Sequence, residues 1–430
     1  MTKETDIKTK EKNKFDNEET KLFLIYTIIG IIALIARASF ISFESGDYTW
    51  FLKPWFNGLK ERGGMSGVKS FTGDYEPLYV TILALLTYFP ISSLFSIKIV
   101  SIIGDYILAF SSAKLVGILA KDRKNAEKLK IITYTIILFL PNVLINASMW
   151  AQCDSIYSAF IILAFCDLFE RKYNRMFAFL GIALAFKLQT ILILPLFVTM
   201  YFVRKDFHWY QFLIIPAMLV ICAIPAMCFG MPFSKIFTCF FTQVSEYSEY
   251  ITLNFPSIFN LFSLKKIPFN SVLFLKVEWV LITLLVDLFI FIFTLKNKER
   301  LNNENIILLA IVFLTVETFL LPKMHERYLF VGEILSVIYA ITYLKNFIPA
   351  IWLNFQALIL YLIVLNYDFD MWYLSFNRRF KYRNSLLVLM TLIFAMVTLY
   401  YLIHYIGKMD KKKPIKDINL KIKSKKKIIE

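Results

Sequence analysis

The sequence predicts an all-α fold, a multipass transmembrane bundle of about 11 to 13 hydrophobic helices, many of them near the roughly 20 residues that cross a bilayer. Three observations predict it. The 430 residues are 58% hydrophobic and only 19% charged, with a mean hydropathy of +0.60. Long apolar runs recur without the alternating segments of a β-barrel. Helices are the remaining structure that satisfies backbone hydrogen bonds inside a bilayer.

Both ends of the chain are polar and are expected in the cytosol. Residues 1–21 form a Lys-, Glu- and Asp-rich tail, which predicts disorder, and Leu22 to Phe43 then acts as a first anchor instead of a cleavable signal peptide. Ten Lys lie between Lys408 and Lys427. The net charge of +16 therefore indicates a basic tail on anionic lipid at residues 407–430, and no nucleic-acid partner. The five cysteines lack the paired spacing of disulfides or zinc sites.

Loop charge predicts which apolar runs cross the membrane, because short connections rich in Lys and Arg lie in the cytosol. Such connections are residues 121–130, 171–175, 204–205, 296–300 and 345. They agree with one topology only if Tyr79 to Phe95 is interfacial or re-entrant, within a long first extracytoplasmic loop at residues 44–96. They also require Met176 to Val203 to be two half-helices that meet near Lys187-Leu188-Gln189.

The other apolar runs cross in alternating directions. They are Leu22–Phe43, Ile97–Ala120, Ile131–Met149, Ser155–Phe169, Gln211–Phe229, Val272–Leu295, Ile306–Leu321, Tyr328–Tyr343, Phe347–Leu365 and Leu386–Ile406. Five polar segments then share the extracytoplasmic face, namely residues 44–96, 150–154, 230–270, 323–328 and 366–384. We expect the functional site on that face of a cell-membrane protein.

The first loop supplies two candidate general bases. Asp47 follows the first helix, and Asp74 stands in Gly73-Asp74-Tyr75-Glu76-Pro77, where the interfacial helix begins. A carboxylate at a helix end beside a low-dielectric surface can have a raised pKa, which suits general base catalysis. The alternative is a solvated acidic loop in which Asp74 caps the helix.

The densest polar segment joins two apolar helices and reads Pro322-Lys323-Met324-His325-Glu326-Arg327-Tyr328. Cations at headgroup depth attract anionic groups, and a guanidinium binds phosphate oxygens bidentately. Arg327, Lys323, His325 and, from the broken helix, Lys187 are therefore the candidate phosphate ligands. Glu326 could simply neutralise its neighbours, and Lys187 could instead snorkel or pair with a carboxylate.

Trp150, Gln152 and Asp154 begin the fourth crossing. Sugar C–H faces stack on indole, and amide and carboxylate groups bind hydroxyls, so this group suits carbohydrate. An interfacial Trp beside an Asp cap is the alternative.

Charged residues inside the helices also have two interpretations. Glu317 and Glu333 would pair with Arg327 or hold sugar hydroxyls, and Arg37 and Asp105 would pair with site residues or with each other. No cofactor is otherwise indicated. Asp368-Phe369-Asp370 resembles a metal-binding DxD, so a Mg²⁺ or Mn²⁺ ion stays open beside an ordinary solvated loop.

Several of these motifs together resemble the GT-C membrane glycosyltransferases, most closely the bacterial relatives of the PIG-V-type GPI mannosyltransferases. The matching residues are Asp47, Gly73 to Tyr79, Trp150 to Tyr157, Lys187 to Gln189, Asn254 to Asn260 and Pro322 to Tyr328. The resemblance covers about residues 22–345, which would form the catalytic module. Residues 346–406 match only in hydropathy and would add C-terminal helices. Phe255 and Cys153 depart from the pattern and would alter the sugar pocket.

The resemblance implies an inverting transfer of a mannose-like hexose from a polyprenyl-phosphate donor to a glycan or glycolipid acceptor on the outer face. Asp47 would be the general base. Tyr75, Gln189, Asn254 and Glu326 would join the sugar and acceptor contacts. Other cell-envelope glycan assembly proteins would be partners.

Two other classes stay open. A lipid-carrier polysaccharide polymerase or ligase uses the same lipid phosphate but is expected to carry its site in a large late loop. A transporter or flippase of lipid-linked sugars would show internal repeats and midplane charge, and no repeat is visible. The richness in Lys, Ile, Asn and Phe favours a bacterial source and an undecaprenyl-type carrier.

Overall fold

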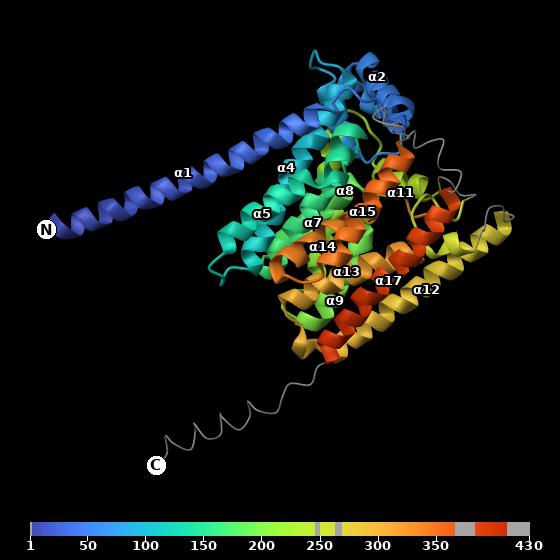
Figure 1. Ribbon diagram of the computed structural model, residues 1–430. Helices are drawn as coiled ribbons and strands as arrows, with labels where there is room; N and C mark the ends of the chain where they lie inside the picture. Colours follow the sequence, from blue (N-terminus) through green and yellow to red (C-terminus); the bar gives the residue numbers. More distant parts are fainter. Residues whose placement is uncertain (1, 246–249, 263–268, 366–382, 411–430) are drawn as a thin grey trace, which may run out of the picture.

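The structure is a computed structural model that describes residues 2–245, 250–262, 269–365 and 383–410 (Figure 1). Every regular element in these segments is a helix, which confirms the all-α prediction. Seven helical stretches among them are long and apolar enough to cross a membrane, so the chain is a multipass helical membrane protein. These stretches are Glu18–Ala38 of α1, α4 (Ser93–Leu119), Trp209–Cys228, Leu273–Lys296 of α12, α13 (Asn303–Leu320), α15 (Phe347–Val364) and Ser385–Asp410 of α17.

Other predicted crossings are bent or short. α5 (Ala126–Phe139) continues after a 51° bend into Pro141–Met149, which comprises α6 (Pro141–Leu144) and the π-helix η3 (Ile145–Met149), and this bent pair would make an eighth span. The bend falls at a proline, which lacks the N–H that a continuous helix needs. α7 (Asp154–Phe169) and α14 (Phe330–Tyr343) have 16 and 14 residues and are largely buried in the bundle. The total number of crossings stays a prediction.

The N-terminal segment differs from the expected disordered tail at residues 1–21. α1 (Thr2–Ala38) is one continuous helix, and its N-terminal part leads away from the bundle (Figure 1). Lys and Glu, which are frequent in this segment, are good helix formers. The local propensity of the tail therefore prevails over its polarity.

Short helices order the first loop. They are η1 (Tyr48–Leu52), α2 (Lys53–Glu61), η2 (Gly64–Ser70) and α3 (Pro77–Leu86). α3 replaces the longer helix predicted at Tyr79 to Phe95, and its length of about 15 Å is half that of the hydrocarbon core. The Tyr48 hydroxyl lies 2.8 Å from the Ser93 hydroxyl at the start of α4, so the loop ends near the point at which it began.

The helix predicted to break near Lys187 does break there. α8 (Tyr173–Phe186) ends at Lys187, whose backbone is extended, and the chain continues through η4 (Leu188–Ile193) into α9 (Leu194–Arg204). Arg204 donates to the Leu168 carbonyl (3.2 Å) and to the Tyr173 hydroxyl (3.3 Å). The end of α9 therefore returns to the start of α8, as two half-helices that turn back at Lys187 require.

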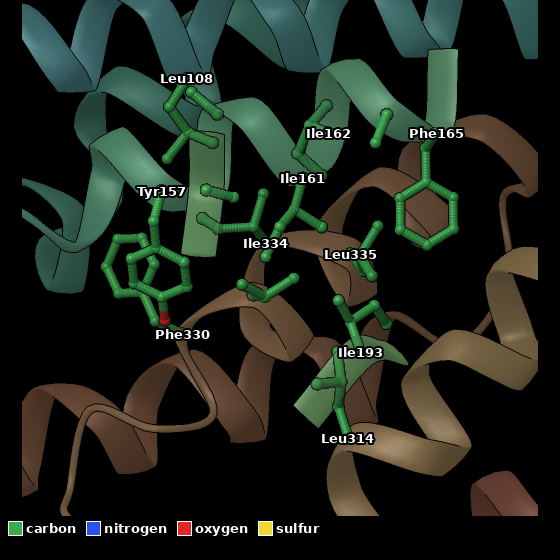
Figure 2. Close-up of a cluster of buried hydrophobic side chains, with 14 of the residues drawn as sticks. Leu108, Tyr157, Ile161, Ile162, Phe165, Ile193, Leu314, Phe330, Ile334 and Leu335 are labelled. Atoms are coloured by element: carbon green, nitrogen blue, oxygen red, sulfur yellow. The ribbon is translucent and has the colours of Figure 1, made fainter. Parts of the chain in front are cut away.

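The core holds this turn in place. Figure 2 shows Ile193 in one cluster with side chains of four other elements, which are Leu108 of α4, Tyr157, Ile161, Ile162 and Phe165 of α7, Leu314 of α13, and Phe330, Ile334 and Leu335 of α14. Most of these side chains are fully buried. Burial of Leu- and Ile-sized groups stabilises a packed state by about 1.5–3 kcal/mol each relative to water. Inside a bilayer the tight packing itself supplies most of the gain.

The basic connections gather at one end of the bundle, which we call the basic face. Glu304, at the start of α13, accepts hydrogen bonds from Lys408 and Lys345, and Arg123 donates to the Thr342 carbonyl. α10 (Ile214–Cys228), α11 (Lys235–Ser245), η6 (Ile258–Leu261), α12 (Phe269–Lys296) and α17 (Arg383–Asp410) complete the described helices discussed below. Most of the predicted 366–384 loop, with Asp368 and Asp370, and residues 411–430 of the basic tail lie outside the described residues.

Candidate active site

The structure brings together side chains from four distant segments at the end opposite the basic face. Asp47 comes from the first loop, Trp150, Gln152 and Asp154 from the turn before α7, Lys187 from the helix break, and Arg327 from the α13–α14 connection. The Ser45 hydroxyl donates to the Trp150 carbonyl (2.8 Å), which fixes the first loop against the turn before α7. One network therefore contains a candidate general base, Asp47, and two of the candidate phosphate ligands, Arg327 and Lys187.

Asp47 is held through one of its two carboxylate oxygens. Oδ2 accepts hydrogen bonds from Trp150 Nε1 (3.0 Å), Gln152 Nε2 (2.6 Å) and Arg327 (3.4 Å). Oδ1 accepts none from the residues that the structure describes, and the side chain is 32% exposed. Asp47 precedes η1 without capping it. Its second oxygen is therefore oriented and available to a proton donor from outside.

Asp154 lies deeper and is almost fully enclosed. Its Oδ1 accepts from Lys187 Nζ (2.6 Å), and its Oδ2 accepts from Asn146 Nδ2 (2.7 Å). Arg327 Nε lies 3.8 Å from the same Oδ2. The side chain of Asp154 is 1% exposed. Asp154 thus serves as the buried counter-ion of two cations, and it is not placed to receive a proton from solvent.

Gln152 connects the two carboxylates. Its amide nitrogen donates to Asp47, while its carbonyl oxygen accepts from Lys187 Nζ (3.0 Å) and the Tyr75 hydroxyl (3.3 Å). The chain reaches this position through Ala151, whose φ of 66° is left-handed. Asn146 stabilises the turn, since its carbonyl accepts from Gln152 N (2.9 Å) and its side chain accepts from Asp154 N (3.3 Å).

Arg327 is the cation that contacts Asp47, at its Oδ2 atom. Its guanidinium lies 5.3 Å from the centre of the Trp150 ring, a cation–π distance, and the side chain is 16% exposed. Although burial acts to lower it, the carboxylates of Asp154, Asp47 and Glu326 raise the pKa of Arg327 well above its ordinary value. Arg327 therefore stays charged.

Glu326 is a buried carboxylate next to Arg327 in the chain, and it lies near the Arg327 guanidinium. Its Oε1 lies 4.0 Å from Arg327, and its Oε2 lies 3.9 Å from His325 Nδ1. Burial acts to raise the pKa of Glu326, but His325 and Arg327 together hold it below its ordinary value. Glu326 is 2% exposed, so it neutralises its neighbours, as one interpretation of the sequence held, and it has little access to a ligand.

Lys187 was expected to bind phosphate, and the structure gives its ammonium another role. The Nζ atom donates to both Asp154 and Gln152, and the side chain is 5% exposed. The ammonium also lies 5.9 Å from the centre of the Tyr75 ring. Direct phosphate contact would require these hydrogen bonds to break, so pairing with a carboxylate, the alternative prediction, describes Lys187 as it stands.

Other predicted residues lie outside this network. Lys323 donates from Nζ to the Val244 carbonyl at the end of α11 (2.7 Å), and Asp74 accepts through its carbonyl from Gln243 (2.5 Å). Asp74 is also not the cap of α3, whose N-cap is Glu76. The carboxylate of Asp74 has no hydrogen-bond partner among the described residues, so its proposed catalytic role gains no support from position.

Two predicted contact residues lie next to the α13–α14 connection. Gln189 lies beside the Tyr328 phenol and acts to lower its pKa, against the larger effect of burial. Asn254 has a left-handed φ of 63°, and the next residue, Phe255, donates its N–H to the Met324 carbonyl (3.4 Å). The 250–262 segment thus packs on the connection that carries Arg327.

Glu76 is a site residue that the sequence did not single out. Its Oε1 accepts from Leu188 N (3.2 Å), at the helix break, and from Gln243 of α11 (3.1 Å). It is 2% exposed, and burial raises its pKa to about 8. Its place before Pro77 in the Gly73–Tyr79 motif was the available signal, because such a carboxylate can bond N–H groups that no helix satisfies.

The charged residues inside the helices are mostly paired away from the site. Arg37 Nε donates to Asp105 Oδ2 (2.8 Å), so these two residues pair with each other, as one alternative predicted. Glu333 accepts from Asn142 (2.6 Å), and Arg327 has its ion pairs elsewhere. Glu317 is buried, and one of its oxygens has no partner in the described part of the chain. The predicted pairing of Glu317 or Glu333 with Arg327 is therefore wrong.

The described segments contain no group of three His, Cys, Asp or Glu side chains that could hold a metal ion. The carboxylates of Asp47, Asp154 and Glu326 surround Arg327 instead of an open space for a cation. No protein-family model matches the chain, and no curated protein matches its sequence.

Proposed function

We propose that the protein is a membrane glycosyltransferase of GT-C type, which transfers a hexose from a polyprenyl-phosphate donor to a hydroxyl of a glycan or glycolipid acceptor. The observation that carries the proposal is the state of Asp47. Three donors hold its Oδ2 atom while Oδ1 is open, and the guanidinium of Arg327 lies on the held side. An oriented base beside a fixed cation is what a displacement of a lipid phosphate by an alcohol requires.

The chemistry follows from these two groups. The acceptor oxygen attacks the anomeric carbon while its proton passes to Asp47 Oδ1. The bond between the anomeric carbon and the phosphate oxygen breaks, and its electron pair leaves with the polyprenyl phosphate. A single displacement inverts the anomeric centre. The phosphate leaves as an anion, so no general acid is needed, and Arg327 stabilises the added charge.

The remaining residues of the network set the geometry of these two. Trp150 and Gln152 orient the Asp47 carboxylate, and Trp150 also presents its indole face to Arg327. Lys187 balances the charge of Asp154, and both Lys187 and Asn146 donate hydrogen bonds to its carboxylate. Asp154 in turn lies beside Arg327. Because folding already fixes these side chains, the reaction does not need to spend free energy on orienting them.

The proposal is tested with purified protein in detergent and a panel of polyprenyl-phosphate sugars offered with lipid-linked and free glycan acceptors. A new glycosidic bond, detected by mass spectrometry of the product, is the expected result. Asp47→Asn should reduce its rate by about 10²–10⁴. Asp122→Asn, a carboxylate exposed on the basic face, is the matched control and should retain the wild-type rate.

Two outcomes would contradict the proposal in different ways. Full transfer by Asp47→Asn would confirm a transferase but refute the assignment of Asp47 as its general base. Movement of intact lipid-linked sugar across a vesicle membrane without a new glycosidic bond would identify a transporter or flippase instead. Successive transfers that lengthen one lipid-linked glycan would point to the related polymerase or ligase chemistry.

A further inference from the structure

A second concave site lies at the opposite end of α7 from Asp154. A shallow, open groove of about 440 Å³ lies between the α7–α8 turn and the first turn of the span Trp209–Cys228. It is lined by Arg171, Lys172, Tyr173, Asn174, Arg175 and Gln211. The Gln211 amide donates to Asn174, so a hydrogen bond joins the two walls. None of these residues belongs to the proposed active site.

The lining of this groove carries a fixed cation and an unpaired one. Arg175 donates two hydrogen bonds to the buried Asp167, from Nε to Oδ2 (2.6 Å) and from the terminal nitrogen to Oδ1 (2.5 Å), which fixes its guanidinium plane. Lys172 donates to Glu170 (2.5 Å), and its side chain is 50% exposed. Arg171 is exposed and makes no ion pair with any described residue. One oriented guanidinium and one unpaired guanidinium therefore face the same groove.

Further charge around the groove strengthens its positive character. Arg204 reaches the Tyr173 hydroxyl (3.3 Å), and Tyr173 and Arg204 share Asp206 as a partner. Lys205 follows at once. Around the groove, cations outnumber carboxylates, so an anion would be attracted without displacing the existing pairs.

Aromatic side chains place the groove at the depth of lipid headgroups. Trp209 and Tyr210 are 65% and 54% exposed, and they begin the span to which the lining residue Gln211 belongs. Tyr and Trp at the end of a membrane span lie at the boundary between headgroups and acyl chains. Leu213, 56% exposed, continues the same surface toward the apolar part of the span. A molecule in the groove would thus have polar contacts above an apolar wall.

We propose that this groove binds the phosphate group of an anionic phospholipid, with its acyl chains along the exposed face at Trp209, Tyr210 and Leu213. Guanidinium groups form bidentate hydrogen bonds with phosphate oxygens, and the amides of Asn174 and Gln211 and the Tyr173 hydroxyl match the polar remainder of a headgroup. Basic pockets on the cytoplasmic side of helical bundles are suited to such lipids. The groove is independent of the glycosyltransferase proposal.

The test is a lipid titration of the purified full-length chain in detergent, followed by native mass spectrometry. The probes are cardiolipin, phosphatidylglycerol, phosphatidylcholine and inorganic phosphate. We expect saturable binding of the two anionic lipids and weaker binding of phosphatidylcholine. Arg171→Ala/Lys172→Ala should weaken anionic lipid binding about tenfold or more, because each cation near a charged lipid contributes to attraction.

The control removes the same charge from the same face without touching the groove. Lys121→Ala/Lys124→Ala alters two exposed lysines of the 121–130 connection and should leave the lipid affinity unchanged. Arg171→Ala alone, at an exposed and unbonded side chain, gives a second reading if the double variant misfolds. Equal weakening by the control pair, or wild-type affinity of both groove variants, would overturn the site. Binding of inorganic phosphate without lipid preference would overturn the lipid assignment.

Discussion

Two Arg–carboxylate groups within this protein differ in how completely they are satisfied. Arg37 and Asp105 are both 0% exposed, and Arg37 donates to Asp105 and to the carbonyls of Ala33 (3.1 Å) and Leu138 (3.0 Å). The second oxygen of Asp105 accepts from Ser155 (2.5 Å). In this closed pair the guanidinium nitrogens and both carboxylate oxygens have partners. Its role is to join α1, α4 and α5.

The group around Arg327 is open by the same criteria. Its ion-pair distances to Asp47 and Asp154 are 3.4 and 3.8 Å, and its Nε atom is buried without a hydrogen-bond partner in the described part of the chain. Asp47 keeps an open oxygen. Buried polar groups left unsatisfied are costly, so they mark sites where a ligand completes the set. The proposed active site therefore differs from the other buried ion pair in its incomplete pairing, and not in the burial of charge.

The largest expected effect belongs to the closed pair. Arg37→Ala leaves the Asp105 carboxylate buried without its cation, which costs about 3–5 kcal/mol. We expect a large fall in the thermal unfolding midpoint in detergent, and a transfer rate per folded molecule close to wild type. Lys53→Ala is the control, because its pair with Glu44 is 3.5 Å long and largely exposed. Loss of transfer without loss of stability would reverse the distinction between the two groups.

Arg327→Ala should have the next largest effect, on transfer. Loss of a fixed donor to a charge that develops in the reaction lowers the rate by about 10²–10³. Asp154 keeps Lys187 and Asn146, so the unfolding midpoint should fall less than in Arg37→Ala. Arg327→Lys retains the charge without the planar fork and should lie between the two. A transfer rate unchanged in Arg327→Ala would remove this residue from the site.

The third prediction concerns pH and Glu76. Burial raises its pKa from 4.5 to about 8, so between these values the folded protein binds more protons than the unfolded chain. The free energy of unfolding should therefore fall as pH rises through this window. Glu76→Gln keeps an acceptor for Leu188 N but cannot ionise. The difference in unfolding midpoint between variant and wild type should increase from pH 5 to pH 9, and a constant difference would contradict the assigned burial effect.

Trp150→Phe should give the smallest effect. It removes the hydrogen bond of 3.0 Å to Asp47 but keeps an aromatic face beside Arg327. A hydrogen bond to a charged group contributes about 1.5–3 kcal/mol. Because Gln152 and Arg327 still hold the Asp47 carboxylate in the variant, only part of this energy is lost, and we expect the transfer rate to fall about tenfold. The measurement is the initial rate at saturating donor. A loss as large as that of Arg327→Ala would mean that Trp150 binds substrate directly.

The sequence was sufficient for the all-helical fold class and the broken helix, and it singled out several residues that the structure brings together in the proposed site. Apolar runs and loop charge are local properties, and they are enough to predict the turn at Lys187. Asp47, Gln152, Asp154 and Arg327 stood out as polar residues at helix ends that share one face. Such residues converge because the bundle leaves them no other polar surroundings.

The partners of these residues could not be predicted in the same way. Lys187 faces Asp154 instead of an open phosphate site, Lys323 reaches Val244, and Glu76 bonds the helix break across the chain. These contacts depend on the relative depth and rotation of helices, which hydropathy does not specify. In α1 the wrong prediction has a local cause. The polar composition of residues 1–21 predicted disorder, but the helix propensity of the same residues gives a continuous helix.

The most direct test of the central claim compares Asp47→Asn with Asp105→Asn in one preparation. Each variant removes one carboxylate charge beside an arginine. We predict that Asp47→Asn loses transfer by about 10²–10⁴ while keeping its unfolding midpoint near wild type, and that Asp105→Asn loses stability but retains transfer per folded molecule. Transfer retained by Asp47→Asn and lost by folded Asp105→Asn would contradict the account.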